Sequence, residues 1–202
     1  MSAKKGLIRW LSAFVAFDMV VLGGLLVQQL RAASIDPQMV TGALMSLLTP
    51  PLLLLLTAIL SSDVKATLVF WKVRHALPGH RAFSKYVLGD ARINATALYE
   101  RIGEFPIEPR SQQTEWYRLY RQHRDDDAVL DANQRFLLFR DLATVSALLA
   151  IGVPIALKLF GLQVAMVPAS AVFAAQYLLS AIAAQQAGIR LVRTVLAIES
   201  AS

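Results

Sequence analysis

The stretch VTGALMSLLTPPLLLLLTAIL, residues 40–60, has 21 residues and no charged side chain. A helix rises about 1.5 Å per residue, so roughly 20 apolar residues cross the hydrocarbon core of a bilayer. Residues 10–30 form a second stretch of this kind, with Asp18 as its one charge. Further on, residues 142–157 and 159–189 are uncharged. We therefore predict four spans, at about 10–30, 40–60, 141–160 and 164–188.

The composition supports a membrane protein. The 202-residue chain is 56% apolar and 17% charged, with a mean hydropathy of +0.51, whereas soluble domains are about 25% charged. Residues 62–141 hold 24 of the 34 charged side chains. The expected fold is an all-α integral membrane protein with four transmembrane helices and a helical cytosolic domain inserted between spans 2 and 3. Its parts are an N-terminal transmembrane hairpin (1–61), the cytosolic helical domain (62–141) and a C-terminal transmembrane hairpin with a short cytosolic tail after residue 188 (142–202).

The basic residues predict the orientation, because Lys and Arg concentrate on the cytoplasmic side. With the N-terminus inside, eighteen basic residues are cytoplasmic, and only Arg31 and Lys158 are external. Both termini and the middle domain are then cytoplasmic, in a bacterial inner membrane. The external parts are then only two short hairpins, at about 31–38 and 160–163. A cleaved signal peptide is disfavoured, since the first apolar run is too long and a second span follows.

The cytosolic segment reads as helical throughout. We expect span 2 to continue as an amphipathic helix to about Ala76, where Leu77-Pro78-Gly79 stops it. Asp90 is a candidate N-cap for a helix that ends near Gly103. Residues 105–109, with two prolines, are extended or turned.

Two further helices follow in the same segment. Ser111 opens a helix with Trp116, Leu119, Tyr120 and His123 on one face. One residue of Asp125–Asp127 caps the next helix, whose apolar spacing runs from Val129 into span 3. The membrane region and the cytosolic domain are thus expected to share a helix.

Asp18 is the one ionisable residue well inside a span. A charge at such depth tends to face the bundle interior or a wet cavity, which makes it a candidate for a conduction or gating path. The structural alternative is a protonated carboxyl that hydrogen-bonds a polar residue at comparable depth, such as Gln176.

Small residues and prolines mark two further features of the spans. Pro50, Pro51 and Pro154 are hinge candidates, because proline frees a backbone carbonyl and kinks a helix. Ala171 and Ala175, four residues apart in span 4, let helices approach closely, either within one protomer or between copies of a homo-oligomer.

A basic stretch with interleaved aromatic residues leaves the membrane directly after span 2. It fits anionic lipid headgroups, an anionic small-molecule ligand or an acidic protein partner. Nucleic acid is disfavoured, because the domain has a net charge of only about +2. The basic residues are Lys65, Lys72, Arg74, Arg81, Lys85 and Arg92.

Other chemistry finds little support in the residues. The chain has no cysteine, and His75, His80 and His123 lack the spacing of metal ligands. We predict no cofactor and no metal. Trp116, Tyr117 and Tyr120 form a candidate surface for a cytosolic protein partner.

Three functions stay open at this point. The first is a non-enzymatic sensor or effector whose cytosolic domain responds to a ligand or partner and alters the membrane region, through a pore, bilayer disruption or a signal. The second is a passive anchor or scaffold for a cytosolic protein, and the third an intramembrane enzyme or transporter, which one carboxylate in four short spans disfavours. The layout is similar to small multi-span effectors and accessory proteins of bacterial stress and phage-defence systems, a resemblance of architecture alone.

Overall fold

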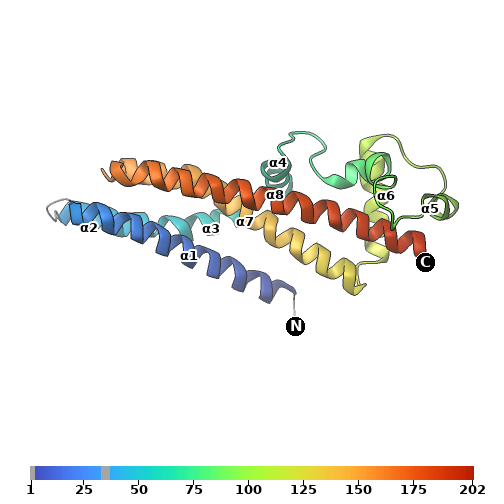
Figure 1. Cartoon of the computed structure of the whole chain (residues 1–202), viewed down its shortest axis with the longest axis horizontal. Helices are drawn as coiled ribbons and strands as arrows, with labels where there is room; N and C mark the ends of the chain where they lie inside the picture. The colour runs from blue at the N-terminus through green and yellow to red at the C-terminus, as the bar shows by residue number, and fades with distance from the viewer. Residues whose placement is uncertain (1–2, 33–36) are drawn as a thin grey trace.

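The computed structural model describes residues 3–32 and 37–202, which are helical with short connections and contain no strand (Figure 1). The all-helical prediction is confirmed, as are four helices or helix pairs long and apolar enough to cross a membrane. Most of the predicted hairpin at 31–38 lies outside the described residues. The helices are α1 (Ala3–Ala32), α2 (Pro37–Leu47), α3 (Thr49–Ile59), α4 (Ser62–Phe70), α5 (Ala95–Ile102), α6 (Pro109–Gln122), α7 (Asp127–Leu159) and α8 (Gln163–Ala201), with a 3₁₀ turn η1 (Pro78–Arg81) and a π turn η2 (Ala82–Tyr86).

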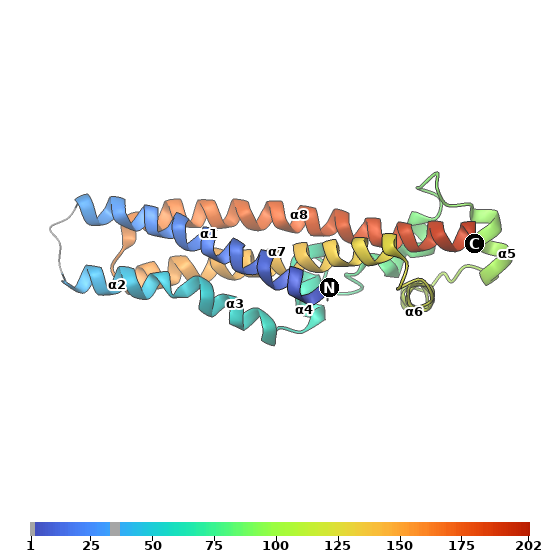
Figure 2. The same ribbon diagram turned by 90° about the horizontal axis from the view of Figure 1, so that it is seen from below.

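An antiparallel pair of long helices, α7 and α8, runs the length of the molecule (Figures 1 and 2). A tight turn joins them, in which Leu162 N–H donates to Leu157 O at 2.8 Å and Gly161 N–H to Lys158 O at 3.2 Å. Gly161 adopts φ +72°, a left-handed conformation that glycine supplies without steric cost. The turn satisfies the last carbonyls of α7 and sends the chain straight back.

The second apolar stretch is broken where the sequence predicts one span. α2 ends at Leu47 and α3 begins at Thr49. Pro50 and Pro51 occupy the first turn of α3, where a missing N–H costs nothing because that N–H has no partner inside the helix. The prolines therefore start a new helix, and their role as a hinge stays a prediction.

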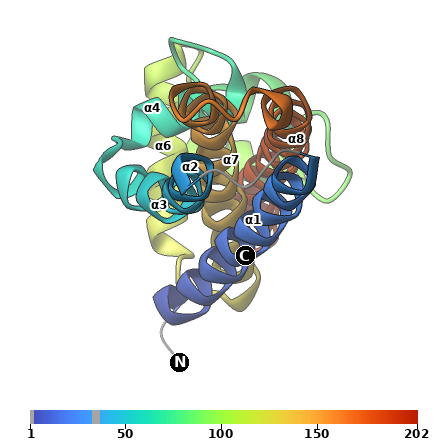
Figure 3. The ribbon, with the colours of Figure 1, turned by 90° about the vertical axis from the view of Figure 1, so that its left-hand side faces the viewer.

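The predicted continuation of this stretch to Ala76 is wrong. The chain bends at Leu60–Ser61, and the Ser61 side chain accepts a hydrogen bond from Val64 N–H at the start of α4. α4 then runs across the long axis of the molecule (Figures 1 and 3). It ends at Phe70, because Trp71 adopts a left-handed φ of +53°.

From α4 onward the chain forms a compact end region that we call the head. It comprises residues 62–126 with the adjoining ends of α7 and α8, at about 127–141 and 185–201. The remainder, which holds the four apolar stretches, is the shaft. The α2–α3 pair lies along the shaft, and α1 runs along it until its N-terminal end reaches the level of α4 (Figures 1 and 2).

The helix ends in the head follow the predictions in part. Asn94, rather than Asp90, caps α5, with its side chain accepting from Ala97 N–H, and Gly103 ends that helix as expected. α6 begins two residues before the predicted Ser111, because Glu108 is the N-cap that accepts from Ser111 N–H. Asp126 caps α7, within the predicted triplet.

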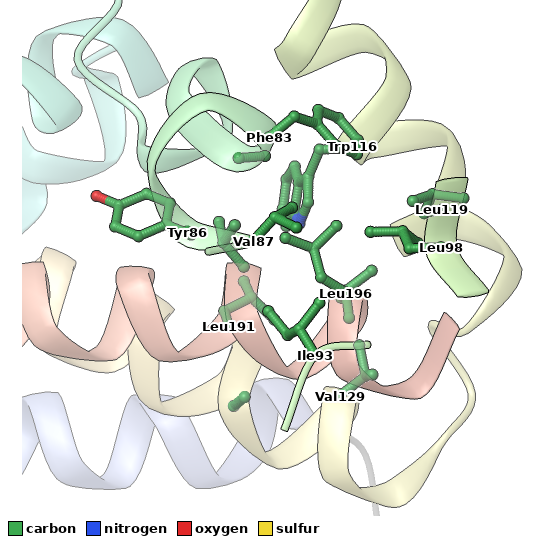
Figure 4. Packing of buried hydrophobic residues seen from close by; sticks show 14 of the residues in the cluster. Phe83, Tyr86, Val87, Ile93, Leu98, Trp116, Leu119, Val129, Leu191 and Leu196 are labelled. Atoms are coloured by element: carbon green, nitrogen blue, oxygen red, sulfur yellow. The ribbon is translucent and has the colours of Figure 1, made fainter. Parts of the chain in front are cut away.

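The head has its own apolar core, and α8 completes it (Figure 4). Leu191, Val192, Val195 and Leu196 come from α8 and pack against side chains of η2, α5, α6 and α7. Residues 189–201, expected to form a short tail, are thus an unbroken part of α8 and of this core. The core residues from the other elements are Ala82, Phe83, Tyr86, Val87, Ile93, Leu98, Trp116, Leu119, Val129, Ala132 and Phe136.

Gly188 lies where the head meets the shaft, at a position with little room for a side chain. A Cβ at this position would lie 3.0 Å from Phe70 Cζ and 3.1 Å from the Phe136 ring. We expect Gly188→Leu to lower the free energy of unfolding by about 1–3 kcal/mol through overpacking. Thermal unfolding in detergent, followed by size exclusion, measures it. Gly24→Leu is the matched control, because no heavy atom lies within 4 Å of its Cβ position. Equal midpoints for the two variants would contradict this packing.

Candidate functional site

Asp18 and Gln176 form a buried polar pair between α1 and α8. The Asp18 side chain is fully buried, and Gln176 Nε2 donates to its Oδ1 at 2.8 Å. The structure therefore brings together the two residues that the topology places at similar depth. Asp18 Oδ2 has no hydrogen-bond partner among the described residues. An unpaired buried carboxyl oxygen is costly, and the gating role of Asp18 stays a prediction.

A second polar group ties α4 to the long pair. Lys65 Nζ lies 3.2 Å from Asp141 Oδ1, and Arg140 Nη2 lies 3.1 Å from the same oxygen, with side chains only 11–16% exposed. On the neighbouring helix, Gln185 Nε2 donates to Val69 O at 2.7 Å. The Lys65 side chain is therefore largely buried in an ion pair and does not belong to an exposed surface for lipid headgroups.

The C-terminal end of α4 is held by aromatic side chains. Trp71 Nε1 donates to Tyr177 Oη at 2.9 Å, and that hydroxyl donates to Leu68 O at 2.7 Å. The last carbonyls of a helix lack partners within it, so this arrangement satisfies one of them from α8. α4 is thus fixed to the long pair at both its polar and its aromatic contacts.

The predicted basic stretch does not form one continuous patch. Arg92 pairs with Asp90 through two hydrogen bonds of 3.0 and 2.7 Å. These bonds, above all, lower the pKa of Asp90 to about 2. Arg81 Nη2 donates to Ala76 O at 3.4 Å. Lys72, Arg74, Lys85 and Arg92 have exposed side chains, and the Arg92 guanidinium is paired with Asp90.

A pocket of about 740 Å³ opens beside α4, between that helix, η1 and the start of α6. Two arginines and two histidines line it together with two carboxylates. The His75 and His80 rings lie 4.8 Å apart between centroids, and His80 Nδ1 donates to Leu77 O at 3.2 Å. The ionisable lining residues are Asp63, Arg74, His75, His80, Glu108 and Arg110.

Charge and burial act together on His80. Burial lowers its pKa, and the positive charges of His75, Arg81 and Arg110 lower it further, although the bond to Leu77 O opposes this. The ring is therefore predominantly neutral near pH 7, with its proton on Nδ1. Within the described residues, no three His, Asp or Glu side chains converge in a way that could hold a metal ion.

The predicted partner surface on α6 is smaller than expected. Trp116 is 8% exposed and belongs to the head core, so it offers no ring to a partner. Tyr120 is half-buried and stacks between the rings of Trp116 and Tyr117, at 5.6 and 5.8 Å. Tyr117 alone of the three is exposed, at 50%.

The proline and alanine candidates of α7 and α8 lie in different environments. Pro154 lies inside α7, which stays helical around it. Nearby, a Cβ on Gly152 would lie 2.9 Å from Leu53 Cδ1, so α3 approaches α7 closely there. Ala171 and Ala175 are exposed on α8, whereas Ala169 is fully buried within the chain.

Some residues of these sites escape sequence reasoning. Asp63 and Arg110 line the pocket with Arg74, but 47 positions separate them in the chain, so no motif links them. Tyr177 and Gln185 sit in an apolar stretch and bond to backbone carbonyls of α4. Only the bend of α4 away from the shaft brings these groups together.

Comparison of the chain with protein families, curated proteins and solved structures finds no match in any of the three. The function therefore has to be argued from the geometry alone.

The Asp18–Gln176 hydrogen bond can be tested as a pairwise energy. We expect Asp18→Leu and Gln176→Leu to be non-additive in a double-mutant cycle, with a coupling of about 0.6–2 kcal/mol, the usual strength of such bonds between apolar helices. Unfolding of the chain in bicelles measures it. The control cycle replaces Gln176→Leu with Gln186→Leu, an exposed residue farther along α8. Additive energies in the first cycle would refute the pairing.

Proposed function

We propose that this chain is a four-pass protein of the bacterial inner membrane, with its head and both termini in the cytoplasm. The support is the length of the apolar helices and the distribution of charge. Residues 163–185 of α8, for example, rise about 33 Å and contain no Asp, Glu, Lys or Arg. Eighteen of the 20 Lys and Arg residues fall on the proposed cytoplasmic side.

This topology has a direct test, because the chain has no cysteine. Leu88 lies in the head and is 85% exposed, and Gln163 lies at the turn between α7 and α8. The test uses the single-cysteine variants Leu88→Cys and Gln163→Cys. In intact cells, a membrane-impermeant maleimide should label Gln163→Cys and leave Leu88→Cys unlabelled until the membrane is broken. The reverse pattern, or equal labelling in intact cells, would overturn the orientation.

Within this topology, we propose that the protein is a non-enzymatic sensor or effector. Its head responds to a ligand or partner, and the response alters the shaft. One observation carries the proposal: α7 and α8 pass without interruption from the shaft into the head and supply part of the core at each end. A shift of the head must therefore move the shaft ends of the same two helices.

Features of the shaft suggest where the response is expressed. Asp18 joins α1 to α8 through one side-chain hydrogen bond, and α2 and α3 meet at a proline break. An apolar bundle with one buried carboxyl among its described residues and a broken helix has the elements of a two-state device. The output would be a pore, local bilayer disruption or a signal to another protein.

Proton flux distinguishes an active shaft from a passive one. We expect vesicles containing the wild-type chain to dissipate an imposed pH gradient, read by a trapped pH-sensitive dye. Asp18→Asn removes the ionisable proton with little change of volume, and it should return the rate close to that of protein-free vesicles. Asp131→Asn is the matched control, because this exposed aspartate lies in the head. Wild-type vesicles that never leak faster than protein-free ones would refute a proton path, as would an unaffected Asp18→Asn.

The passive-anchor alternative rests on exposed apolar side chains of the head. Tyr117, Ile107 and Leu88 are 50%, 85% and 85% exposed, which a cytosolic partner could cover. An exposed small-residue pair, Ala171 and Ala175, likewise suits a homo-oligomeric contact. Capture of one defined soluble protein, lost with Tyr117→Ala, would favour the anchor.

A further inference from the structure

The pocket beside α4 lies at the end of the second apolar stretch, where the proposed membrane surface would be. Only two residues separate the end of α3 from the start of α4, so α4 marks the point where the second apolar stretch stops. It also runs across the long axis, as an interfacial helix on a membrane surface would (Figures 1 and 3). Trp71 and Val73, which follow α4, are 55% and 89% exposed, and tryptophan favours the headgroup level of a bilayer.

The groups around this pocket suit a phosphate. Arg74 and Arg110 come from two different elements and line the same space, and guanidinium groups form strong charge-assisted hydrogen bonds to phosphate oxygens. Of the two carboxylates, Glu108 is already engaged, since it accepts hydrogen bonds from Ser111 N–H and Ser111 Oγ at 3.0 and 2.8 Å. These bonds leave Glu108 ionised, so Glu108 and Asp63 together balance the formal charges of the two arginines. Protonation of His80 therefore decides the net charge of the pocket.

The backbone around the pocket is held in an unusual conformation. Trp71 and His75 have φ values of +53° and +52°, in the left-handed region that residues with a Cβ occupy rarely. Such conformations cost free energy and cluster at ligand sites. Here they fold residues 71–77 around the cavity and place Arg74 and His75 on its wall.

We propose that this pocket binds a phosphate group, with Arg74 and Arg110 as its main ligands and His80 as an additional, protonatable donor. The phosphate comes either from a phospholipid headgroup or from a soluble phosphate ester. The inference deepens the proposed function, on which its membrane placement rests, by naming the chemistry that the head recognises.

The histidine gives the site a pH dependence. His80 uses Nδ1 to donate to Leu77 O, which leaves Nε2 to take up a second proton. His75, Arg81 and Arg110 oppose that proton, whereas Asp63 and Glu108 on the pocket wall favour it. A bound phosphate adds negative charge, raises the pKa of His80 and makes protonation easier. The affinity for a phosphodiester, whose own charge does not change in this range, should therefore increase as the pH falls from 8 to 6.

The test measures binding directly, on the full chain in a phosphate-free maltoside detergent. Native mass spectrometry counts bound short-chain phosphatidylglycerol in one arm, and equilibrium dialysis measures inorganic phosphate and phosphoethanolamine in the other. Arg74→Gln and Arg110→Gln should each weaken binding about tenfold or more. Lys72→Gln, which removes an exposed charge two residues from Arg74 but outside the pocket, should stay within about twofold. In the phosphatidylglycerol arm, where the charge of the phosphodiester is constant between pH 6 and 8, His80→Gln should remove the pH dependence.

Each outcome has a defined meaning, once unchanged thermal midpoints show that the variants fold. Binding in the lipid arm alone assigns a headgroup site, and binding in the soluble arm alone assigns a soluble ligand. Both support the phosphate pocket. No binding in either arm, or equal losses for Lys72→Gln and the arginine variants, overturns it. Because proton flux is not part of this measurement, its failure leaves the proposed function to its own test.

Discussion

The antiparallel packing of α7 against α8 is the constraint on which the rest of the structure depends. One glycine turn, at Gly161, sends the chain back along itself, and the two helices then contribute to every apolar core cluster of the described residues. α4 is tied to this pair by the Lys65–Asp141 contact and by Gln185. The head is consequently continuous with the shaft, because α7 and α8 contribute to both.

The polar groups follow from this arrangement. Inside the shaft, a lone carboxyl has to find a partner on a neighbouring helix, and Asp18 finds Gln176. At the start of the head, α4 turns aside and opens a space that Arg74 and Arg110 enter from separate elements. A phosphate in that space would touch the residues between α4 and α6, from which a change reaches α7 and α8 through the shared core. The proposed phosphate site and the proposed response of the shaft are thereby linked by a continuous series of packing contacts.

Much of this fold follows from residue patterns. Long uncharged stretches predict the apolar helices, and the 3–4 spacing from Val129 to Ala143 predicts that α7 runs on into the head. The break at Pro50 follows from the missing proline N–H. The bend at Ser61 has no comparable signal, because Leu60-Ser61-Ser62 is compatible with a continuing helix.

The sites divide in the same way. Asp18 is predictable because a carboxylate is costly in an apolar span, and Gln176 follows from counting helical rise. For Trp116, the sequence correctly predicts the face of its helix but not its burial. The core that covers it includes residues of α8 some 75 positions later in the chain. The pocket is also non-local, since it exists only when α4 lies across the long axis.

Hydrogen exchange across the junction tests the central claim most directly. In lipid nanodiscs, the amides of residues 181–196 should exchange slowly and at similar rates, because one continuous helix is packed on both sides of Gly188. Residues 72–77, outside regular helix, should exchange quickly in the same experiment. Rapid exchange confined to about 185–190 would reveal a break in α8, and a head that moves independently of the shaft would contradict the account.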